Sequence, residues 1–313
     1  MLNVMSLFDG IAGGYLSLKR AGFKIDNYYA SEIDPNCLKV VEKLNKSNSP
    51  EIIQIGDVRE IDFKKYRGKD INLLLGGSPC QDMSRCGKRE GLAGNRSSLF
   101  WYYVEALRTL HPKWFLFENV YSMSEEDKQT ITSVLNVEPI VIDSAWVSAQ
   151  HRLRYYWTNI SQRKPLPDLD LKVKDIIARD YESKEDSVHF LNRPVDWIPE
   201  EKLRKDKFMP LRIGSLSGLK HSQSNRIYSL EGKTVSLVAN SGGSGGKTGL
   251  YKIDTEDGYI LRKLLPIECE RAQTLPDNYT KVEGISNTQR YKMINNGWTI
   301  NVIAHLLRGI GRG

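Results

Sequence analysis

A glycine-rich turn near the N-terminus reads Ser6-Leu7-Phe8-Asp9-Gly10-Ile11-Ala12-Gly13-Gly14. It follows an apolar run over residues 4–8 and precedes a helical pattern, which is where α/β proteins bind nucleotides. The turn does not match the G-x-G-x-x-G fingerprint of dinucleotide sites. Asp9 would also place a carboxylate where a pyrophosphate needs a neutral or positive cradle. A ligand with no phosphate and a positive centre fits better, and a tight turn that only needs glycine is the alternative.

Short apolar runs alternate with helical patterns through the first half of the chain. Strands are expected at residues 4–8, 27–30, 52–55, 71–75, 114–117, 139–143 and 155–159. Apolar residues at helical spacing occupy 37–44 and 100–110. This alternation predicts an α/β fold, a parallel sheet with helices on both faces. Ligands of such sheets bind beyond the carboxyl ends of the strands, so residues just after each strand should carry the chemistry.

Two further acidic residues end expected strands, Glu32 after the second and Asp57 after the third. A carboxylate in the first position can accept both ribose hydroxyls, and one in the second can accept from an adenine amino group. Each alone is equally consistent with a helix cap or a solvated turn. Together with Asp9 they line one sheet edge. S-adenosylmethionine has sulfonium and ammonium groups and no phosphate, so it fits this edge.

The composition is that of an ordinary globular protein, with 313 residues, 40% hydrophobic and 27% charged. There are 45 Lys and Arg against 38 Asp and Glu, and the net charge of +7 suits a polyanionic partner. No window approaches the roughly 18 apolar residues of a membrane span, and no signal-peptide pattern is present. We therefore expect a cytoplasmic protein without membrane contact. The four cysteines form no C-x-x-C pair, so neither a metal site nor a disulfide framework is expected.

The composition of the sequence changes near Ser161, where prolines and charged residues become frequent. We expect a catalytic and cofactor-binding domain at 1–160, a smaller irregular domain at 161–258, and a segment at 259–313 that packs back onto the first domain. Helices are expected at 266–273 and 299–307. Several basic residues give the middle region phosphate-binding potential: Lys202, Arg204, Lys205, Lys207, Arg212, Lys220 and Arg226. The run 241–248 resembles a phosphate-binding loop but lacks its first glycine, so a loop on a nucleic-acid backbone and a plain linker stay open.

A candidate nucleophile follows the fourth expected strand, in Gly76-Gly77-Ser78-Pro79-Cys80-Gln81. The glycine pair and the rigid proline favour a turn over core packing, so Cys80 is expected at the active edge of the sheet. The stretch 81–96 mixes arginine and lysine with glycine. This composition is typical of a mobile basic loop, with a solvated surface loop as the alternative.

Charged candidates follow later strands. Glu118 ends an apolar strand and should be partly desolvated, which would let it hold or share a proton near neutral pH; capping the next helix is its alternative role. In Gln150-His151-Arg152-Leu153-Arg154, the two arginines share a face if the segment is extended. They could orient a base and a phosphate, or form a solvated charge pair.

In this order the motifs resemble those of DNA (cytosine-5) methyltransferases over the whole chain. The resemblance is carried by Phe8-Asp9-Gly10, Glu32, Asp57, Pro79-Cys80-Gln81, Glu118-Asn119-Val120, Gln150 to Arg154, Glu268-Cys269-Glu270-Arg271, Leu275-Pro276-Asp277 and Asn296-Gly297-Trp298. The segments 148–159 and 298–307 also resemble animal de novo cytosine methyltransferases, whereas 233–251 resembles bacterial and phage enzymes. The chain departs from the family pattern at Asn295, where many relatives have glycine, and at Gln273-Thr274-Leu275.

The resemblance implies a Rossmann-like S-adenosylmethionine-dependent methyltransferase fold with a target-recognition domain at 161–258. It implies that Cys80 adds to carbon 6 of a flipped-out cytosine, that Glu118 serves ring nitrogen 3, and that Arg152 and Arg154 complete the catalytic set. It also implies that the basic stretch 81–96 closes over DNA. The same resemblance assigns S-adenosylmethionine, released as S-adenosylhomocysteine, to Phe8, Asp9, Gly10, Ile11, Ala12, Gly13, Glu32, Ile33, Asp57, Val58, Pro79, Asn296, Gly297 and Trp298.

The implied partner is double-stranded DNA, methylated by a monomer that is bacterial or phage-encoded. A cognate restriction endonuclease is a candidate partner. Methylation of a structured RNA such as tRNA, and a non-catalytic DNA-binding accessory role, stay open as alternatives. The presence of Cys80, Glu118 and Arg154 argues against the accessory role.

Overall fold

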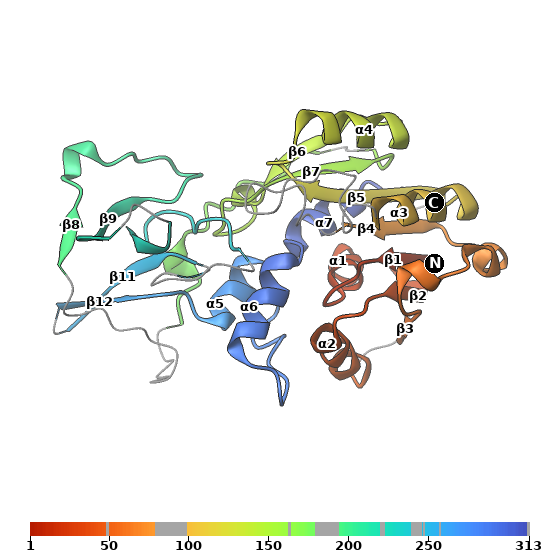
Figure 1. The fold of residues 1–313 in the computed structure, drawn as a ribbon, viewed down its shortest axis with the longest axis horizontal. Coiled ribbons are helices and arrows are strands. Elements are labelled where there is room, and N and C mark those ends of the chain that lie inside the picture. Colours follow the sequence, from red (N-terminus) through yellow and green to blue (C-terminus); the bar gives the residue numbers. More distant parts are fainter. Residues whose placement is uncertain are drawn as a thin grey trace. The chain divides into compact units, whose positions relative to one another are not determined.

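The computed structural model describes residues 1–47, 50–78, 99–161, 164–178, 194–219, 223–238, 246, 248–256 and 258–311. The chain forms two compact units (Figure 1). The first comprises Met1–Ile142, Leu153–Pro165 and Val302–Gly313, and the second comprises Asp143–Arg152 and Leu166–Asn301. Residues 259–301 thus belong to the second unit, while the stretch from Val302 belongs to the first. The functional division expected at residues 160 and 258 stays a prediction.

The first unit is built on a seven-stranded sheet with the order β3-β2-β1-β4-β5-β7-β6. Its strands are β1 (Leu2–Leu7), β2 (Ile25–Ser31), β3 (Ile52–Gln54), β4 (Leu73–Gly76), β5 (Trp114–Val120), β6 (Ile140–Asp143) and β7 (Leu153–Thr158). Neighbours from β3 to β5 pair in parallel, as the alternation of strands and helices predicts. Strand β7 pairs with β5 antiparallel, which corrects the expectation of a wholly parallel sheet. A helix at Glu125–Leu135 and β6 lie between β5 and β7 in the chain, so the alternation of strands and helices continues up to β7 and does not indicate its direction.

Helices follow the strands of this unit: α1 (Gly13–Ala21), α2 (Pro35–Asn45), α3 (Phe100–Leu110), α4 (Glu125–Leu135) and, near the C-terminus, α7 (Ile300–Leu307). Short 3-10 helices lie at Val58–Glu60 and Phe63–Lys69. No bounds were predicted for helix α4, which Ser124 caps by accepting a hydrogen bond from the Asp127 amide. The helices cover a core that includes Met5, Leu74 and Trp157.

Glycine is required where α1 meets the sheet. A Cβ on Gly14 would lie 2.5 Å from the Tyr28 hydroxyl oxygen and 2.7 Å from Cδ1 of Leu75. Both distances are far below van der Waals contact, so the backbone of α1 approaches β2 and β4 only because this side chain is missing. The close approach brings the glycine-rich turn before α1 to the carboxyl edge of the sheet.

The second unit contains a five-stranded sheet with the order β12-β11-β10-β9-β8, which the sequence pattern did not predict. Its strands are β8 (Val195–Trp197), β9 (Arg212–Leu216), β10 (Arg226–Tyr228), β11 (Leu250–Thr255) and β12 (Gly258–Arg262). The unit also contains α5 (Pro266–Ala272), α6 (Asn287–Asn296) and 3-10 helices at Ser144–Trp146, Val173–Asp175, Glu200–Lys202 and Gln223–Asn225. Trp197 and Tyr259, on the two edge strands, have ring centroids 5.7 Å apart, so the sheet curls strongly.

Candidate functional site

The turn after β1 is tightly wound. Phe8, Gly10 and Ala12 all have left-handed backbones, with φ of 59°, 59° and 61°. The Asp9 amide donates to the carbonyl of Ser31, at the end of β2, over 3.0 Å, and the Ala12 amide donates to the Asp9 carbonyl over 3.2 Å. The turn is therefore fixed to the carboxyl ends of β1 and β2, as the sequence predicts for a ligand-binding loop.

The Asp9 carboxyl is buried, with 9% of the residue exposed. One of its oxygens, Oδ1, accepts a hydrogen bond of 2.7 Å from the Tyr28 hydroxyl. The other, Oδ2, has no hydrogen-bond partner in the described part of the chain. The pKa of Asp9 is raised to about 6, mainly by burial and to a smaller extent by the charge of Glu32, against the lowering effect of the Ser6 and Tyr28 hydroxyls. A buried acceptor left open in this turn fits a ligand that carries a positive group.

Glu32 connects the turn to the end of β2. Its Oε2 accepts from the Gly10 amide at 2.8 Å, and its Oε1 accepts from the Ile33 and Asp34 amides, each at 2.7 Å. The carboxylate is thereby held at the sheet edge, as expected. Ile33 beside it is 61% exposed and presents apolar surface there.

Asp57 follows β3 and accepts from the Arg59 amide at 3.0 Å and from the Arg59 guanidinium. These hydrogen bonds hold the pKa of Asp57 below its usual value. Next to it, Val58 is buried. The Asp57 carboxylate thus stays ionised at the sheet edge, where it follows the third strand. In this conformation its oxygens accept hydrogen bonds from Arg59.

Glu118 and Arg154 are brought together by the pairing of β5 with β7. Cross-strand partners are Glu118 with Tyr156 and Val120 with Arg154, which puts the two charged side chains on one face of the sheet. Nε of Arg154 lies 2.9 Å from Oε1 of Glu118, and both side chains are mostly buried, at 14% and 12% exposed. The guanidinium fixes the carboxylate that the sequence singles out as a proton-holding group.

Asn119 is a further site residue whose role the sequence motif alone did not reveal. It is buried, and its Nδ2 donates to Oγ of Ser78 at 3.3 Å. Ser78 directly precedes Pro79 and Cys80, which lie outside the described residues, as does the basic stretch 81–96. The sequence signal that could have indicated this role is an amide side chain directly after Glu118, at the end of a strand. Strands β4 and β5 are parallel neighbours that end close together, so such a side chain can reach the residues that follow β4.

Arg152 does not share its partners with Arg154. It is buried, and its guanidinium donates to the carbonyl oxygens of Asn295 (3.1 Å) and Gly297 (3.0 Å). Gln273 reinforces this end of α6 through Nε2, which donates to the Gly297 carbonyl at 3.3 Å. Arg152 therefore fixes the backbone on both sides of Asn296, whose own side chain is exposed, with Trp298 half-buried after it.

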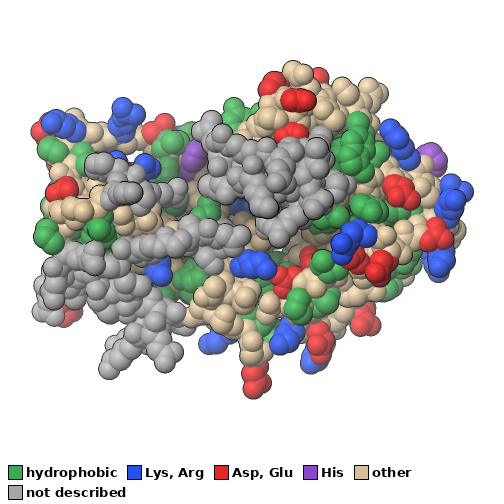
Figure 2. Space-filling view, in the orientation of Figure 1, with side chains coloured by type: hydrophobic (Ala, Val, Ile, Leu, Met, Phe, Trp, Pro, Cys, Tyr) green, Lys and Arg blue, Asp and Glu red, His purple; other side chains and the backbone are tan. Residues whose placement is uncertain are grey.

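The basic residues of the second unit are partly paired with acids. Lys205 lies 3.1 Å from Glu200, and Lys207 contacts Asp168. Figure 2 shows basic side chains interspersed with acidic ones on the face it presents. Of the expected set, Lys220 lies outside the described residues.

The described residues also bear on metal binding and on membrane crossing. No group of three or more His, Cys, Asp or Glu side chains there is arranged to hold a metal ion. None of the described helices has the length and apolarity that a membrane crossing requires.

Solved structures share this fold along the whole chain. The methyltransferase EhMeth of Entamoeba histolytica superposes with a TM-score of 0.74 at 19% identity, covering 99% of this chain and 97% of that one. The Dnmt2 methyltransferase of S. pombe gives a TM-score of 0.70 at 16% identity, with 98% of both chains covered. The fold is the Rossmann-like fold of S-adenosylmethionine-dependent methyltransferases.

The chain belongs to the C-5 cytosine-specific DNA methylase family, whose profile matches residues 2–312. The type II methyltransferase M.HhaI of Haemophilus parahaemolyticus is 29% identical over 330 aligned positions, covering 99% of this chain and 94% of the relative. An orphan methyltransferase of Bacillus phage rho11s is 27% identical over 309 positions, covering 81% of this chain. The match spans 61% of the length of that phage relative.

Proposed function

We propose that this chain transfers a methyl group to carbon 5 of cytosine in double-stranded DNA. The observation that carries the proposal is the Glu118–Arg154 ion pair, at the end of the strand whose Asn119 holds Ser78. Glu118 thus directly precedes, in β5, the residue that contacts the start of the segment leading into Cys80. Membership of the C-5 cytosine-specific DNA methylase family supports methyl transfer to carbon 5 of cytosine as the reaction.

Carbon 5 of cytosine is a weak nucleophile, so the ring must be activated. The Cys80 thiolate adds to carbon 6 and forms an S–C bond, which makes carbon 5 enamine-like. Glu118 holds a proton at ring nitrogen 3 and stabilises the charge of this addition. Carbon 5 takes the methyl group and then loses its proton, and the electron pair of that C–H bond expels Cys80. Carbon 6 is inaccessible in a stacked duplex, so the base is flipped out, as is general for methyltransferases.

S-adenosylmethionine, the proposed cofactor, supplies a methyl group activated by its sulfonium centre. The residues of the first unit suited to hold it are the Asp9 turn, with its open buried acceptor, and the carboxylates of Glu32 and Asp57. Ile33 offers exposed apolar surface beside them. Asn296, exposed at the end of α6, and Trp298 complete the proposed set.

Duplex DNA is the proposed partner, bound by the basic region within 161–258 and acted on in the cytoplasm of a bacterium. We propose that the chain acts as a monomer. A cognate restriction endonuclease is a candidate partner, since one relative is named a type II methyltransferase and another an orphan methyltransferase. Support for the bacterial setting comes from relatives named as type II and phage methyltransferases.

The test compares tritiated methyl transfer from S-adenosylmethionine to duplex DNA and to total tRNA. We expect label in DNA from the wild type and none from Cys80→Ala. Label only in RNA would contradict DNA as the substrate, and absence of label from both would favour a non-catalytic role. Bisulfite sequencing of DNA from expressing cells then gives the methylated context.

A further inference from the structure

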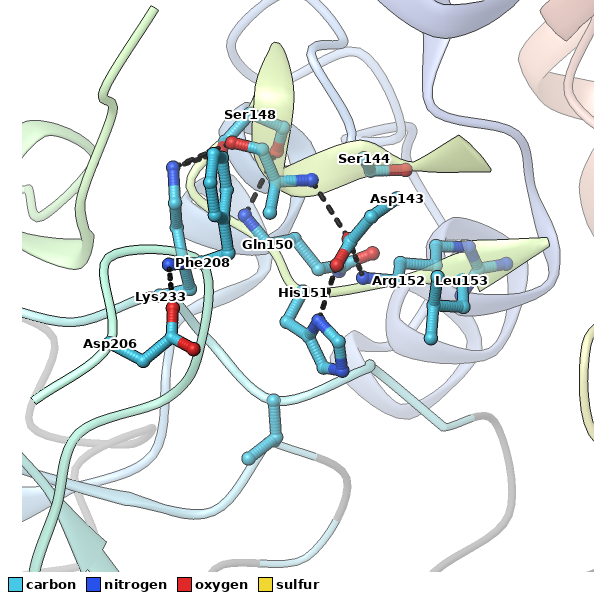
Figure 3. A network of polar contacts seen from close by, with 12 residues as sticks. Asp143, Ser144, Ser148, Gln150, His151, Arg152, Leu153, Asp206, Phe208 and Lys233 are labelled. Carbon is cyan, nitrogen blue, oxygen red and sulfur yellow. Dashed lines mark hydrogen bonds and ion pairs between the residues drawn. The ribbon is translucent and has the colours of Figure 1, made fainter. Parts of the chain in front are cut away.

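Lys233 of the second unit has a fully buried ammonium group that is enclosed by backbone oxygens. Its Nζ donates to the carbonyls of Ala145 at 2.7 Å, Ser148 at 3.0 Å and Leu171 at 2.5 Å. A lysine ammonium has three donors, so all of them are used. Figure 3 shows this side chain reaching Ser148. The sequence pattern gave no indication of this contact.

The hydrogen bonds of Lys233 to Ala145 and Ser148 fix residues 145–148, which lead into Gln150 and Arg152. Next to Lys233, the Thr234 amide donates to the carbonyl of Ala149 at 2.7 Å, and the Thr234 carbonyl accepts from the His151 amide at 3.1 Å. A strand-like bridge between Gln150 and Thr234 results. Residues 233–234 therefore hold residues 145–151 through both side chain and backbone.

This segment carries a polar group that needs support. Gln150 is completely buried, and neither atom of its side-chain amide has a hydrogen-bond partner among the described residues. An unsatisfied buried amide opposes the conformation that holds it, so other contacts must stabilise that conformation. Asp143 provides one such contact by accepting from the Arg152 amide at 2.8 Å. Lys233 provides another from the opposite end of the segment.

We propose that Lys233 is a positioning residue for methyl transfer, which holds residues 145–148 through its hydrogen-bonded ammonium and so sets the place of Arg152. This rests on the function proposed above. Arg152 in turn holds the carbonyls of Asn295 and Gly297. A shift of the segment is thereby passed to a guanidinium of the proposed catalytic set. Small displacements of positioning groups are enough to slow a reaction without preventing binding.

The test uses Lys233→Met, which keeps the length of the side chain and removes its charge and donors, and Lys233→Arg, which keeps a cation. Lys174→Met is the matched control, because Lys174 is an exposed lysine of the same unit that pairs with Glu231 instead of the backbone. Three quantities are measured on each full-length variant: kcat at saturating DNA, affinity for S-adenosylhomocysteine by calorimetry, and amide hydrogen exchange by mass spectrometry.

For Lys233→Met we expect kcat to fall about 10- to 100-fold while cofactor-product affinity changes less than about 3-fold. Exchange should accelerate at residues 145–151 and stay unchanged in β1 and β4. Lys233→Arg should retain more activity than Lys233→Met, and Lys174→Met should match the wild type.

Unchanged kcat and exchange in Lys233→Met would overturn the proposal. So would equal activity of the Met and Arg variants, because the positive charge and its hydrogen-bond donors would then make no difference. A parallel loss of kcat, product affinity and protection in both units would show a general stabilising role and would also overturn it. If the wild type methylates no DNA, the proposed function fails, while the exchange measurement still reports whether Lys233 holds the segment.

Discussion

Nδ2 of Asn119 lies 3.3 Å from Oγ of Ser78, and this contact attaches β5 to the residue before Pro79 and Cys80. Both residues are buried. Oδ1 of Asn119 accepts from the Val120 amide at 2.7 Å, so the amide is oriented with its donors toward Ser78. The strand that carries Glu118 therefore also holds the start of the segment that carries the proposed nucleophile.

Removal of this contact should impair catalysis more than folding. In Asn119→Ala the Ser78 hydroxyl loses its buried donor, and we expect a loss of about 1–3 kcal/mol in the free energy of unfolding. The loss of kcat should be about 10-fold or more, because Cys80 lies two residues beyond the lost contact. A double-mutant cycle with Ser78→Ala, read by urea denaturation and single-turnover kinetics, should show coupling. Strictly additive effects would argue against the contact.

The Glu118–Arg154 pair should matter for both stability and rate. Glu118→Gln keeps the shape of the side chain but leaves a mostly buried guanidinium without its carboxylate, at a cost of about 1–3 kcal/mol. We expect kcat to fall about 100-fold or more, because an amide cannot share a proton with the base. Glu42→Gln, which breaks an exposed pair with Lys46 at the C-terminal end of α2, is the control and should leave both quantities nearly unchanged. Full activity of Glu118→Gln would exclude the proposed role.

The buried Asp9 should make stability fall as pH rises. Its pKa of about 6 in the folded chain lies above the value of 3.8 for an unperturbed aspartate. The folded state thus holds the proton more tightly, and the associated stability is fully present below pH 3.8 and is lost as pH rises to about 6. Between pH 5 and pH 8 this group alone should remove about 1.4 kcal/mol from the free energy of unfolding.

Asp9→Asn should abolish that dependence, since the amide does not titrate and its oxygen can still accept from Tyr28. Urea denaturation of both proteins across this pH range measures the difference. Parallel pH curves for wild type and variant would contradict the raised pKa of Asp9.

Gly14 should not tolerate a side chain. Gly14→Ala would place Cβ against Tyr28 and Leu75, and overpacking of this kind costs about 1–3 kcal/mol. Gly68→Ala is the matched control, because a Cβ there meets nothing within 4 Å and the backbone has no positive φ. Thermal unfolding should show a lower Tm for the first variant only. An equal Tm for both would mean that α1 can move away from the sheet at little cost.

The first unit could be predicted in outline because its strands are continuous apolar runs that end in charged or glycine-rich turns. Glu32 and Asp57 could be placed at one edge because parallel strands end on the same side. The strand β7 was expected at 155–159, but its antiparallel direction was not. The short strands β8 to β12 escaped prediction altogether. Strands of three to six residues contain too few alternations to show a period.

The partners of the arginines could not be predicted from spacing. Arg152 and Arg154 are two residues apart, yet one contacts the end of α6 and the other contacts Glu118. The partners of Arg152 are more than a hundred residues away in the sequence, and the partner of Arg154 lies on a neighbouring strand. The sequence around the two arginines contains no information about either. Lys233 is a clearer case, because a lone lysine in a polar region predicts a solvated side chain, whereas the structure buries it among carbonyls.

The central claim is a transient bond between Cys80 and carbon 6 of cytosine, and trapping tests it most directly. Duplex DNA with every cytosine replaced by 5-fluorocytosine is incubated with the protein and S-adenosylmethionine, then analysed under denaturing conditions. Because fluorine replaces the proton that must leave carbon 5, the S–C bond should persist, and peptide mass spectrometry should find the nucleotide on Cys80. A wild-type protein that methylates ordinary duplex DNA yet forms no such adduct, or an equal adduct yield from Cys80→Ala, would contradict the account.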